Sequence, residues 1–345
     1  MKKGLSAGCP SRYPFRCVFR KKFDIFRNTH AENPTGNNFA AAPSIVDSLG
    51  GDIVKKLYSN KLVITSLVLP GILLFLFAIL TPICLSAYYS FTDYSGMGAI
   101  NFIGFENYTK LFGDKIFFTA LRNSLFLAIG FICIQHPLAI IVAAVLDKLS
   151  GKGEGFFRCV YFIPNVISVA VIAYLWKFIY NPDFGLLNNV LKIFGVTEKI
   201  NWLSQDRAIW SVLIVLVWHG FGWGMLIYYS GIKNIDPVLY EAAAIDGANQ
   251  KQIFLRVTLP LMKPVIQVNV TMAVISALKQ METVYLLTNG GPGNTTQFMA
   301  SYLYQQAFKA FKYGYGNAIS VIFVIICLLA TVVLNKIFEE RREVR

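Results

Sequence analysis

The chain has 345 residues, of which 55% are hydrophobic and only 15% are charged, and its mean hydropathy is +0.52. An ordinary soluble domain has an apolar share of roughly 45–50%, so these values exclude an ordinary soluble domain. The net charge of +13 does not indicate a nucleic-acid partner, because the basic residues stand at the ends of apolar runs, as in membrane proteins. The six cysteines form no paired framework and support no inference about the redox compartment.

The first 59 residues differ in composition from the rest of the chain. They mix many Lys and Arg with a Pro/Gly/Asn-rich run at residues 33–38. No apolar segment follows the charges, which excludes a cleaved signal peptide. The composition predicts a basic, disordered cytoplasmic extension over residues 1–59 that contacts anionic lipid headgroups. A later start codon is the alternative, and the intact mass of the purified chain would decide it.

Six apolar runs are each long enough to cross roughly 30 Å of hydrocarbon at about 20 residues per helix. They lie at residues 62–89, 118–146, 157–179, 208–231, 261–287 and 318–338. Prolines such as Pro137 and Pro164 interrupt several runs, which membrane helices tolerate because neighbouring helices repair the backbone bonding. The sequence therefore predicts an all-α membrane protein with six transmembrane helices in a domain of residues 60–345, with its core at 118–338.

The distribution of basic residues predicts the orientation of these spans. With the N-terminus inside, the cytoplasmic pieces are residues 1–61, 147–158, 232–263 and 336–345, and they carry 22 of the 32 Lys and Arg. An excess of basic residues on the cytoplasmic side is the usual rule. We therefore expect a multi-pass protein of the bacterial cytoplasmic membrane with both termini in the cytoplasm.

The cytoplasmic piece at residues 237–264 has the pattern of two short amphipathic helices joined by a turn. Residues 240–245 are rich in Ala, the best helix former, and Gly247 can take the left-handed conformation that ends a helix. From Gln250 the apolar residues again fall at helical spacing, and Pro260 and Pro264 stand before the next apolar run. A short helix that does not cross the bilayer suits docking to a partner.

This segment resembles the "EAA" loop in the membrane subunits of bacterial ATP-binding-cassette (ABC) importers. The matching residues stand at the spacing of that family: Glu241, Ala242, Ala243, Asp246, Gly247, Ala248, Gln252, Phe254, Leu259, Pro260 and Pro264. The resemblance implies a type I importer permease whose loop, at residues 237–260, seats in a groove of a cytoplasmic ATPase subunit. It couples ATP hydrolysis to the transport path.

Three further segments resemble the carbohydrate-type permeases of the maltose and glycerol-phosphate importer group. They are Asn-Phe-Ile-Gly-Phe-Glu-Asn-Tyr at 101–108, Phe-Ile-Pro at 162–164 and the Thr-Asn-Gly-Gly-Pro-containing loop at 287–296. The resemblance implies an importer for a sugar or related solute that an external binding protein delivers. It also implies cytoplasmic ATP-binding subunits that hold the ATP and Mg²⁺, and a second permease subunit, as a heterodimer. Lipid is the remaining partner, and this chain binds no cofactor itself.

Within the loop, the resemblance and local chemistry suggest a role for each residue. Glu241 is an acidic contact or a local cap, and Ala242 and Ala243 keep the helix surface flat. Gly247 makes the bend. Asp246 is expected to cap the following helix through backbone N–H groups, and a purely local cap without a partner contact is an equal alternative.

The sequence contains no enzyme site. Gly151-Lys152-Gly153 lacks the spaced glycine and the following Ser or Thr of a phosphate-binding loop. The three histidines are scattered and match no zinc spacing, so no metal site is expected. This chain is therefore not expected to hydrolyse ATP.

Polar and aromatic residues within the later spans are candidates for the substrate path, because ionisable groups inside a membrane are often functional. Lys279 and Glu282 lie three residues apart on the predicted fifth span, hence on one helical face, with Gln280 nearby. A mutual ion pair that reaches the interface is the alternative. On the fourth span the candidates are His219, Trp223 and Tyr228, for which structural packing is the more frequent outcome.

Two other classes of protein fit part of the sequence. A secondary transporter driven by an ion gradient requires intramembrane acidic relays and inverted repeats, and neither is evident. A structural or signalling scaffold accounts for the spans but not for the many fixed positions around Glu241. Dependence of transport on ATP separates the first alternative, and co-purification with an ATPase separates the second.

Overall fold

The computed structural model describes residues 61–149 and 152–339. The predicted extension at residues 1–59 lies outside the described residues. The described part is helical, with one isolated bridge between Thr92 and Phe102 and no strand. Its helices, with π-helical turns written η, are α3 (Lys61–Phe75), η1 (Leu76–Leu80), α4 (Thr81–Tyr89), α5 (Glu106–Phe112), α6 (Lys115–Gly130), η2 (Phe131–Gln135), α7 (His136–Lys148), α8 (Lys152–Val166), α9 (Val169–Ile179), α10 (Leu186–Ile193), α11 (Ala208–Lys233), α12 (Pro237–Ile245), α13 (Gln250–Ile253), η3 (Phe254–Thr258), α14 (Leu259–Leu261), α15 (Lys263–Leu278), α16 (Glu282–Leu287), α17 (Met299–Tyr304), η4 (Gln305–Lys309) and α18 (Tyr313–Glu339).

The chain divides into two units, Met1–Phe75 and Leu76–Arg345. Of the first unit the structure describes only α3, a helix rich in Leu, Val and Ile with Pro70 inside it. The second unit contains every other helix named above, and the account that follows concerns this unit.

By length and composition, four of the described helical stretches can each cross a membrane: Ile64–Tyr89, Lys115–Lys148, Ala208–Lys233 and Tyr313–Phe338. Two bent pairs raise the number to six if each pair is one span. They are Gly153–Val166 with Val169–Ile179, bent by 95°, and Gln250–Leu261 with Lys263–Leu278, bent by 68°. The protein is therefore a multi-pass membrane protein.

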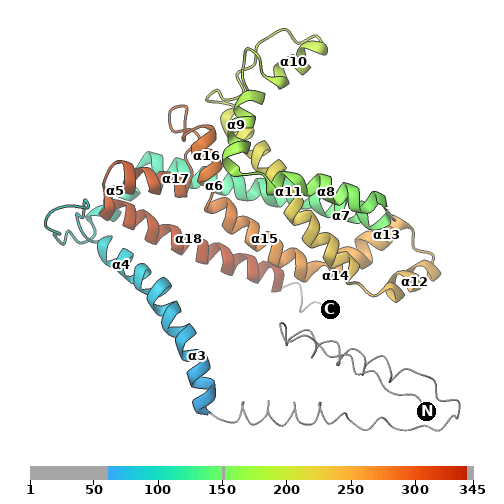
Figure 1. The fold of residues 1–345 in the computed structure, drawn as a ribbon, viewed down its shortest axis with the longest axis horizontal. Helices are drawn as coiled ribbons and strands as arrows, with labels where there is room; N and C mark the ends of the chain where they lie inside the picture. The colour runs from blue at the N-terminus through green and yellow to red at the C-terminus, as the bar shows by residue number, and fades with distance from the viewer. Residues whose placement is uncertain (1–60, 150–151, 340–345) are drawn as a thin grey trace, which may run out of the picture. The chain divides into compact units, whose positions relative to one another are not determined.

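The predicted third span at residues 157–179 is not one straight helix. Ser168 has an extended backbone (φ −56°, ψ 136°) between α8 and α9. Pro164, inside α8, has no N–H to donate to the preceding turn, which weakens the helix just before this break. As a result α9 leaves α8 at a steep angle, and α10 lies beyond it, away from the bundle of α6, α7, α11, α15 and α18 (Figure 1).

Small residues allow the helices of this bundle to approach closely. A Cβ added to Gly222 on α11 would lie 2.2 Å from the carbonyl oxygen of Tyr161 on α8, so only glycine fits there. Ala139 and Ala143 on α7 are fully buried against the same helix α11. Since lipid is as apolar as a leucine side chain, close van der Waals packing of this kind holds membrane helices together.

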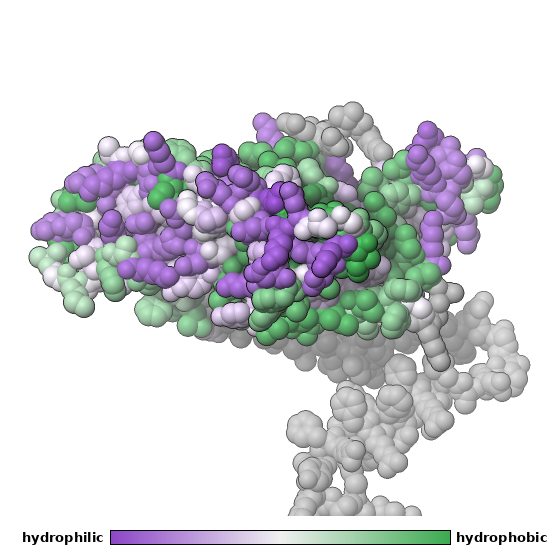
Figure 2. All heavy atoms as spheres, turned by 90° about the horizontal axis from the view of Figure 1, so that it is seen from above, coloured by the Kyte–Doolittle hydropathy of each residue, from purple (hydrophilic) through white to green (hydrophobic). Residues whose placement is uncertain are grey.

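The outer surface of the bundle is strongly apolar. Many large hydrophobic side chains are exposed on η1, α4, α6, α7 and α18, among them Phe77 at 75% and Val332 at 62%. Figure 2 shows broad hydrophobic areas between clusters of hydrophilic residues on one face. This surface is unfavourable in water and suits hydrocarbon.

Candidate functional site

The segment at residues 237–261, here called the elbow, is built as the sequence predicts in its first half. Asp236 begins α12, because its side chain accepts a hydrogen bond from the N–H of Val238 at 3.0 Å, and Pro237 occupies the first helical position. The helix ends at Ile245, and Gly247 follows with φ +78°. Only glycine adopts this conformation without strain, which confirms the predicted bend.

The second half of the elbow corrects one prediction. Asn249, not Asp246, caps the following helix α13: its side chain accepts from the N–H of Gln252 at 2.9 Å, and the Gln252 side chain accepts from the N–H of Asn249 at 2.8 Å. Asp246 instead occupies the position that closes α12. The cap prediction was wrong because the loop extends two residues beyond Gly247, so that Asn249 lies next to the helix. Glu241 lies within α12, which excludes a capping role for it as well.

One side of the elbow is anchored to the bundle and the other is open. Ile253 and Thr258 are buried, and the Tyr240 hydroxyl lies 3.3 Å from the Thr258 hydroxyl. Leu259 and Pro260 are half-buried in α14, directly before α15. The anchor thus ties the base of the elbow to the start of a candidate span.

The open side presents the residues that the sequence selected. Glu241, Ala242, Asp246 and Gly247 are exposed, and Ala243 is half-exposed. Among the residues that the structure describes, neither carboxylate has a hydrogen-bond or ion-pair partner for its side chain. The elbow therefore offers a flat, Ala-rich helix with two free carboxylates.

Next to the elbow, charged side chains join the ends of α7, α8 and α11. Lys233 and Asp147 form an ion pair at 2.9 Å, and the Tyr229 hydroxyl donates to the Glu154 carboxylate. Arg158 lies 5.6 Å from the centre of the Tyr229 ring. Sequence reasoning missed this cluster, although its residues all lie at the ends of apolar runs, where such partners are common. The cluster joins the end of α11, after which the elbow begins, to the ends of α7 and α8.

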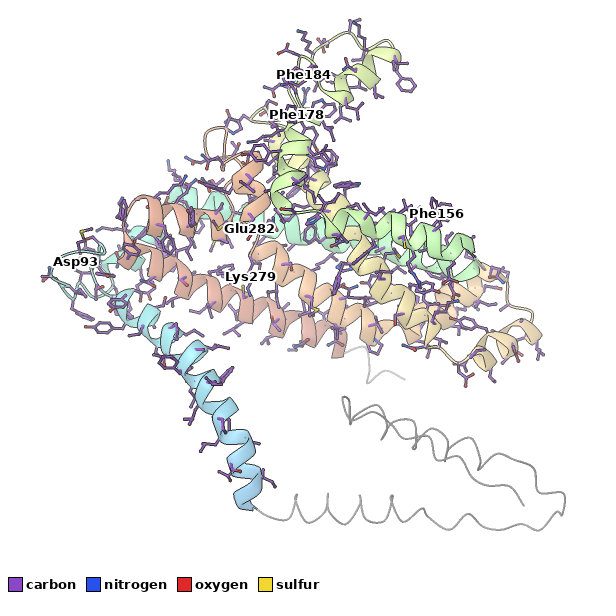
Figure 3. All side chains as sticks on the ribbon, in the orientation of Figure 1. Asp93, Phe156, Phe178, Phe184, Lys279 and Glu282 are labelled. Carbon is purple, nitrogen blue, oxygen red and sulfur yellow. The ribbon has the colours of Figure 1, made fainter. Side chains whose placement is uncertain are left out.

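The substrate-path candidates of the predicted fifth span do not share one helix. The helix α15 ends at Leu278, Lys279 occupies its C-cap, and α16 begins at Glu282 after the non-helical Met281 (φ −137°, ψ −56°). Lys279 and Glu282 therefore lie on either side of a helix break (Figure 3), and the prediction of a common face was wrong. The ion pairs of the described residues do not join them.

Both helix breaks border one groove. Ser168, Val169 and Ala170 at the α8–α9 break, together with Met281 and Glu282 at the α15–α16 break, line a volume of about 490 Å³. Glu282 is exposed and Gln280 is half-exposed. Of the substrate-path candidates, Glu282 alone lines this groove. Discontinuous helices expose backbone groups that bind solutes in other transporters.

The candidates on α11 have different surroundings. Tyr228 is fully buried and its hydroxyl lies 2.6 Å from Nδ1 of His136, so its ring is not available to stack on a sugar in this conformation. His219 is half-exposed, and Trp223 is 56% exposed. The packing alternative thus describes Tyr228, whereas Trp223 presents its ring to the surroundings.

Two buried polar residues in the second span were not selected from the sequence. Gln135 and His136 lie at the end of the π-helical turn η2 and are 6% and 3% exposed. Within residues 61–149 and 152–339, Gln135 Oε1 and His136 Nε2 have no hydrogen-bond partner. The dipeptide Gln-His before Pro137, within an apolar run, is the signal that would have found them, because polar groups are costly inside a membrane.

The loop at residues 288–298 resembles an importer loop in sequence and is held tightly in the structure. Asn123 on α6 donates to the carbonyls of Thr295 at 2.7 Å and Gln297 at 2.9 Å. Thr296 donates to the carbonyl of Gly291 at 2.6 Å, and Gln297 is 1% exposed. The loop thus forms a fixed cap on the end of the bundle opposite the elbow.

Comparison with known families agrees with this arrangement. Residues 135–344 match the family described as "Binding-protein-dependent transport system inner membrane component". The chain is 38% identical over 288 residues to the probable ABC transporter permease protein YurN of Bacillus subtilis, which covers 82% of this chain and 98% of that protein. It is 34% identical over 280 residues to the multiple sugar-binding transport system permease protein MsmF of Streptococcus mutans, over 80% of this chain and 95% of that protein.

The fold is also that of a solved importer. The structure of "a bacterial ABC transporter involved in the import of the acidic polysaccharide alginate" superposes with a TM-score of 0.72 at 24% identity, over 86% of this chain and all of that chain. A permease subunit of this family is not an enzyme, since separate ATPase subunits hydrolyse the ATP. This chain belongs to the family of binding-protein-dependent transport system inner membrane components and is the permease subunit of an ABC importer.

Proposed function

We propose that the chain imports a sugar or a short oligosaccharide that an external binding protein delivers. Relatives that are at least 30% identical over most of this chain are named for such solutes, including the arabinooligosaccharides transport system permease protein AraP of Bacillus subtilis, at 31% identity. The exposed ring of Trp223 supplies an aromatic face, and Ser168 and Glu282 in the groove at the two helix breaks supply hydrogen-bonding groups. Sites that bind carbohydrates combine these two kinds of surface.

The elbow is the proposed coupling loop. The observation that carries this role is a nine-residue helix with the exposed Glu241, followed by the exposed Asp246 and the positive-φ Gly247 and anchored at its base to α15. Neither carboxylate has a side-chain partner within the part of the chain that the structure describes. Glu241 contacts the ATPase, and Ala242 and Ala243 allow the helix to enter a groove. Movement of the ATPase is then transmitted through Leu259 and Pro260 to the span that follows.

The assembly that follows from this role has several further chains. Two cytoplasmic ATPase subunits bind ATP and Mg²⁺, so this chain needs no cofactor of its own. A second permease subunit, as a heterodimer, completes the path, since six spans form one half of it. Lipid surrounds the bundle, and no nucleic acid takes part.

The orientation is proposed from charge. The elbow and the ends of α7 and α8 carry basic residues, including Lys148, Arg158 and Lys251, and such residues concentrate on the cytoplasmic side. Both termini then lie in the cytoplasm, with residues 1–59 as a basic extension before the transmembrane domain at 60–345. The 288–298 loop faces the binding protein.

Crosslinking from the elbow tests this function. A photoreactive amino acid at position 241, in cells that express the full importer, is expected to capture the ATPase subunit. The same group at Asn294, on the opposite cap, is the matched control and is expected to capture no ATPase. Capture from Asn294 and not from position 241 would reverse the orientation and exclude the coupling role.

The substrate path has a separate test. Glu282→Gln and Trp223→Ala are expected to raise the solute concentration needed for half-maximal uptake, while crosslinking from position 241 to the ATPase stays unchanged. Unaltered uptake in both variants would remove these residues from the path and leave the coupling role standing.

A further inference from the structure

A hollow lies between the elbow and the bundle. It has a volume of about 400 Å³, and its wall is mainly apolar. The elbow contributes Ile253 and Phe254, and the end of α7 contributes Ile141, Ala144 and Val145. Its polar rim includes Lys148 and Gln250. The elbow is therefore anchored at its base but stands away from α7.

The wall on α7 continues an exposed apolar stripe. Ile134, Leu138, Ile141 and Val145 follow one another at spacings of four, three and four residues, and they are 46%, 46%, 54% and 55% exposed. Residues at these spacings lie on one face of a helix. Three residues further on, the same face ends at the exposed Lys148. From Ile134 to Lys148 the stripe is about 21 Å long, at 1.5 Å per residue.

The charge at the end of the stripe is uncompensated within the described residues. The side chain of Lys148 has no hydrogen-bond or ion-pair partner there. The neighbouring Asp147 is engaged with Lys233 at 2.9 Å. Among the described residues, a positive group with no counter-ion thus stands at the rim of an apolar hollow, at one end of a candidate span.

We propose that this hollow binds one anionic phospholipid of the cytoplasmic leaflet. Its acyl chain lies along the apolar stripe of α7 and enters the hollow below the elbow, and its phosphate pairs with Lys148. Three observations carry the assignment: the stripe lies on a helical stretch that is long and apolar enough to cross a membrane, it leads into the hollow, and it ends on a lysine with no partner among the described residues. An apolar peptide helix would satisfy the stripe but not the charge.

The lipid deepens the proposed coupling role, on whose orientation it rests. The bound chain fills the space between α7 and Phe254, so that it supports the elbow from the side opposite the ATPase. Elbow movement then changes the volume available to the lipid. The phospholipid composition of the cytoplasmic leaflet then affects how ATP hydrolysis is coupled to transport.

Native mass spectrometry of the purified full-length chain tests the site. Phosphatidylglycerol is the anionic probe, and phosphatidylcholine with the same acyl chains is the neutral one. We expect the chain to retain phosphatidylglycerol preferentially, and Lys148→Ala to reduce that preference about fivefold, the factor that corresponds to about 1 kcal/mol per basic residue near an anionic surface. Lys115→Ala, which removes an exposed lysine at the other end of the same span, is the control and is expected to keep the preference. An equal loss in both variants would overturn the proposal.

A second pair of variants tests the cavity rather than the charge. Val145→Trp places a large side chain in the hollow and is expected to remove the retained lipid. Val332→Trp is the control, because Val332 is similarly exposed, at 62%, but lies on α18 and outside the hollow. Retention that survives Val145→Trp, in a chain whose helix content is unchanged, would contradict the proposal.

A photoreactive amino acid at position 145 in the assembled importer identifies the occupant directly. A phospholipid adduct supports the proposal, whereas an adduct with a partner subunit overturns it. Crosslinking from position 241 to the ATPase is measured in the same preparation. If the ATPase adduct forms and the lipid adduct does not, the lipid site is refuted and the coupling role stands. If no ATPase adduct forms, the coupling role is refuted.

Discussion

The elbow and the 288–298 loop lie at opposite ends of the bundle and are built in opposite ways. In the loop, nearly every polar group is used internally: Asn123 bonds two of its carbonyls, and Thr296 and Gln297 are buried. In the elbow, Glu241 and Asp246 are exposed and have no side-chain partner within the described part of the chain. One end completes its bonding within the chain, and the other leaves groups free for another protein.

A sequence motif can be present because the fold of its own chain requires it or because a partner contacts it, and this difference distinguishes the two cases. The loop motif contains the residues that its own fold requires, so its resemblance to other importers reflects structure. The elbow motif also contains exposed residues, Glu241, Ala242 and Asp246, that contribute little to the fold of this chain. Substitutions should therefore affect stability at the loop and transport at the elbow.

The largest effect is expected at Gly247. Proline fixes φ near −65°, whereas Gly247 has φ +78°, so Gly247→Pro cannot keep the bend and should abolish coupled uptake while the chain remains inserted. Gly247→Asn is the control, since Asn is the residue that best tolerates the left-handed region after glycine, and it should retain most of the uptake. Glu241→Lys should also abolish uptake, because it reverses the charge that we propose to contact the ATPase. Normal uptake in Gly247→Pro would show that the bend is not needed.

The next effect concerns the loop and appears as lost stability. Asn123→Ala leaves the buried carbonyls of Thr295 and Gln297 without their donor, which costs about 1–3 kcal/mol. We expect a lower unfolding temperature in detergent and a loop that proteases cleave more readily. Asn189→Ala is the control, because Asn189 is exposed and donates to Phe184 at 3.2 Å, and its effect should stay within about 0.5 kcal/mol. Equal effects of the two variants would contradict the view that the loop is fixed from within.

Much of this arrangement could be predicted from the sequence, and the first limit concerns breaks in the helices. Apolar runs locate the spans because hydrocarbon demands about 20 apolar residues for each crossing. Gly247 could be placed because few residues accept a positive φ. The break at Ser168 could not, since the apolar pattern resumes directly after it. The break at Met281 falls in the short polar run at residues 279–282, which is also compatible with one face of a continuous helix.

Partner choice between nearby residues is the second limit. Asp246 and Asn249 are both good caps, and the sequence alone does not decide between them. The loop after Gly247 determines which one reaches the first turn of α13, and this is a tertiary property. The same holds for Asp147, whose partner Lys233 is 86 positions away in the sequence.

The choice between Asn249 and Asp246 as the cap of α13 predicts a smaller effect, confined to the elbow. Asn249→Ala removes one half of the capping box with Gln252 and should destabilise α13 by about 1 kcal/mol. Asp246→Ala should leave α13 intact, because Asp246 does not cap it. Hydrogen exchange of the Gln252 amide distinguishes the two: it should be faster in Asn249→Ala alone. If Asp246→Ala accelerates it equally, Asp246 takes part in the cap in solution.

The smallest effect belongs to the end of the bundle that carries the loop and depends on pH. Asp114 begins α6, and burial by itself would raise the pKa of its carboxyl group. Hydrogen bonds from the hydroxyls of Tyr302 and Tyr315 and the N–H groups of Ile116 and Phe117 outweigh burial, so the pKa is lowered.

A lowered pKa means that the folded state favours the carboxylate, so its contribution to stability is fully present above the ordinary Asp pKa of about 3.9. It is lost as the pH falls through the lower pKa of the folded chain. Between pH 5 and 7, which lies above the ordinary Asp pKa of about 3.9, the unfolding temperature of wild type relative to Asp114→Asn should therefore be constant. Below about pH 4 the difference should shrink, because protonated Asp114 then resembles the amide. A difference that shrinks already near pH 6 would show that the carboxylate is not held by these four donors, and this end of the bundle would lose its contrast with the elbow.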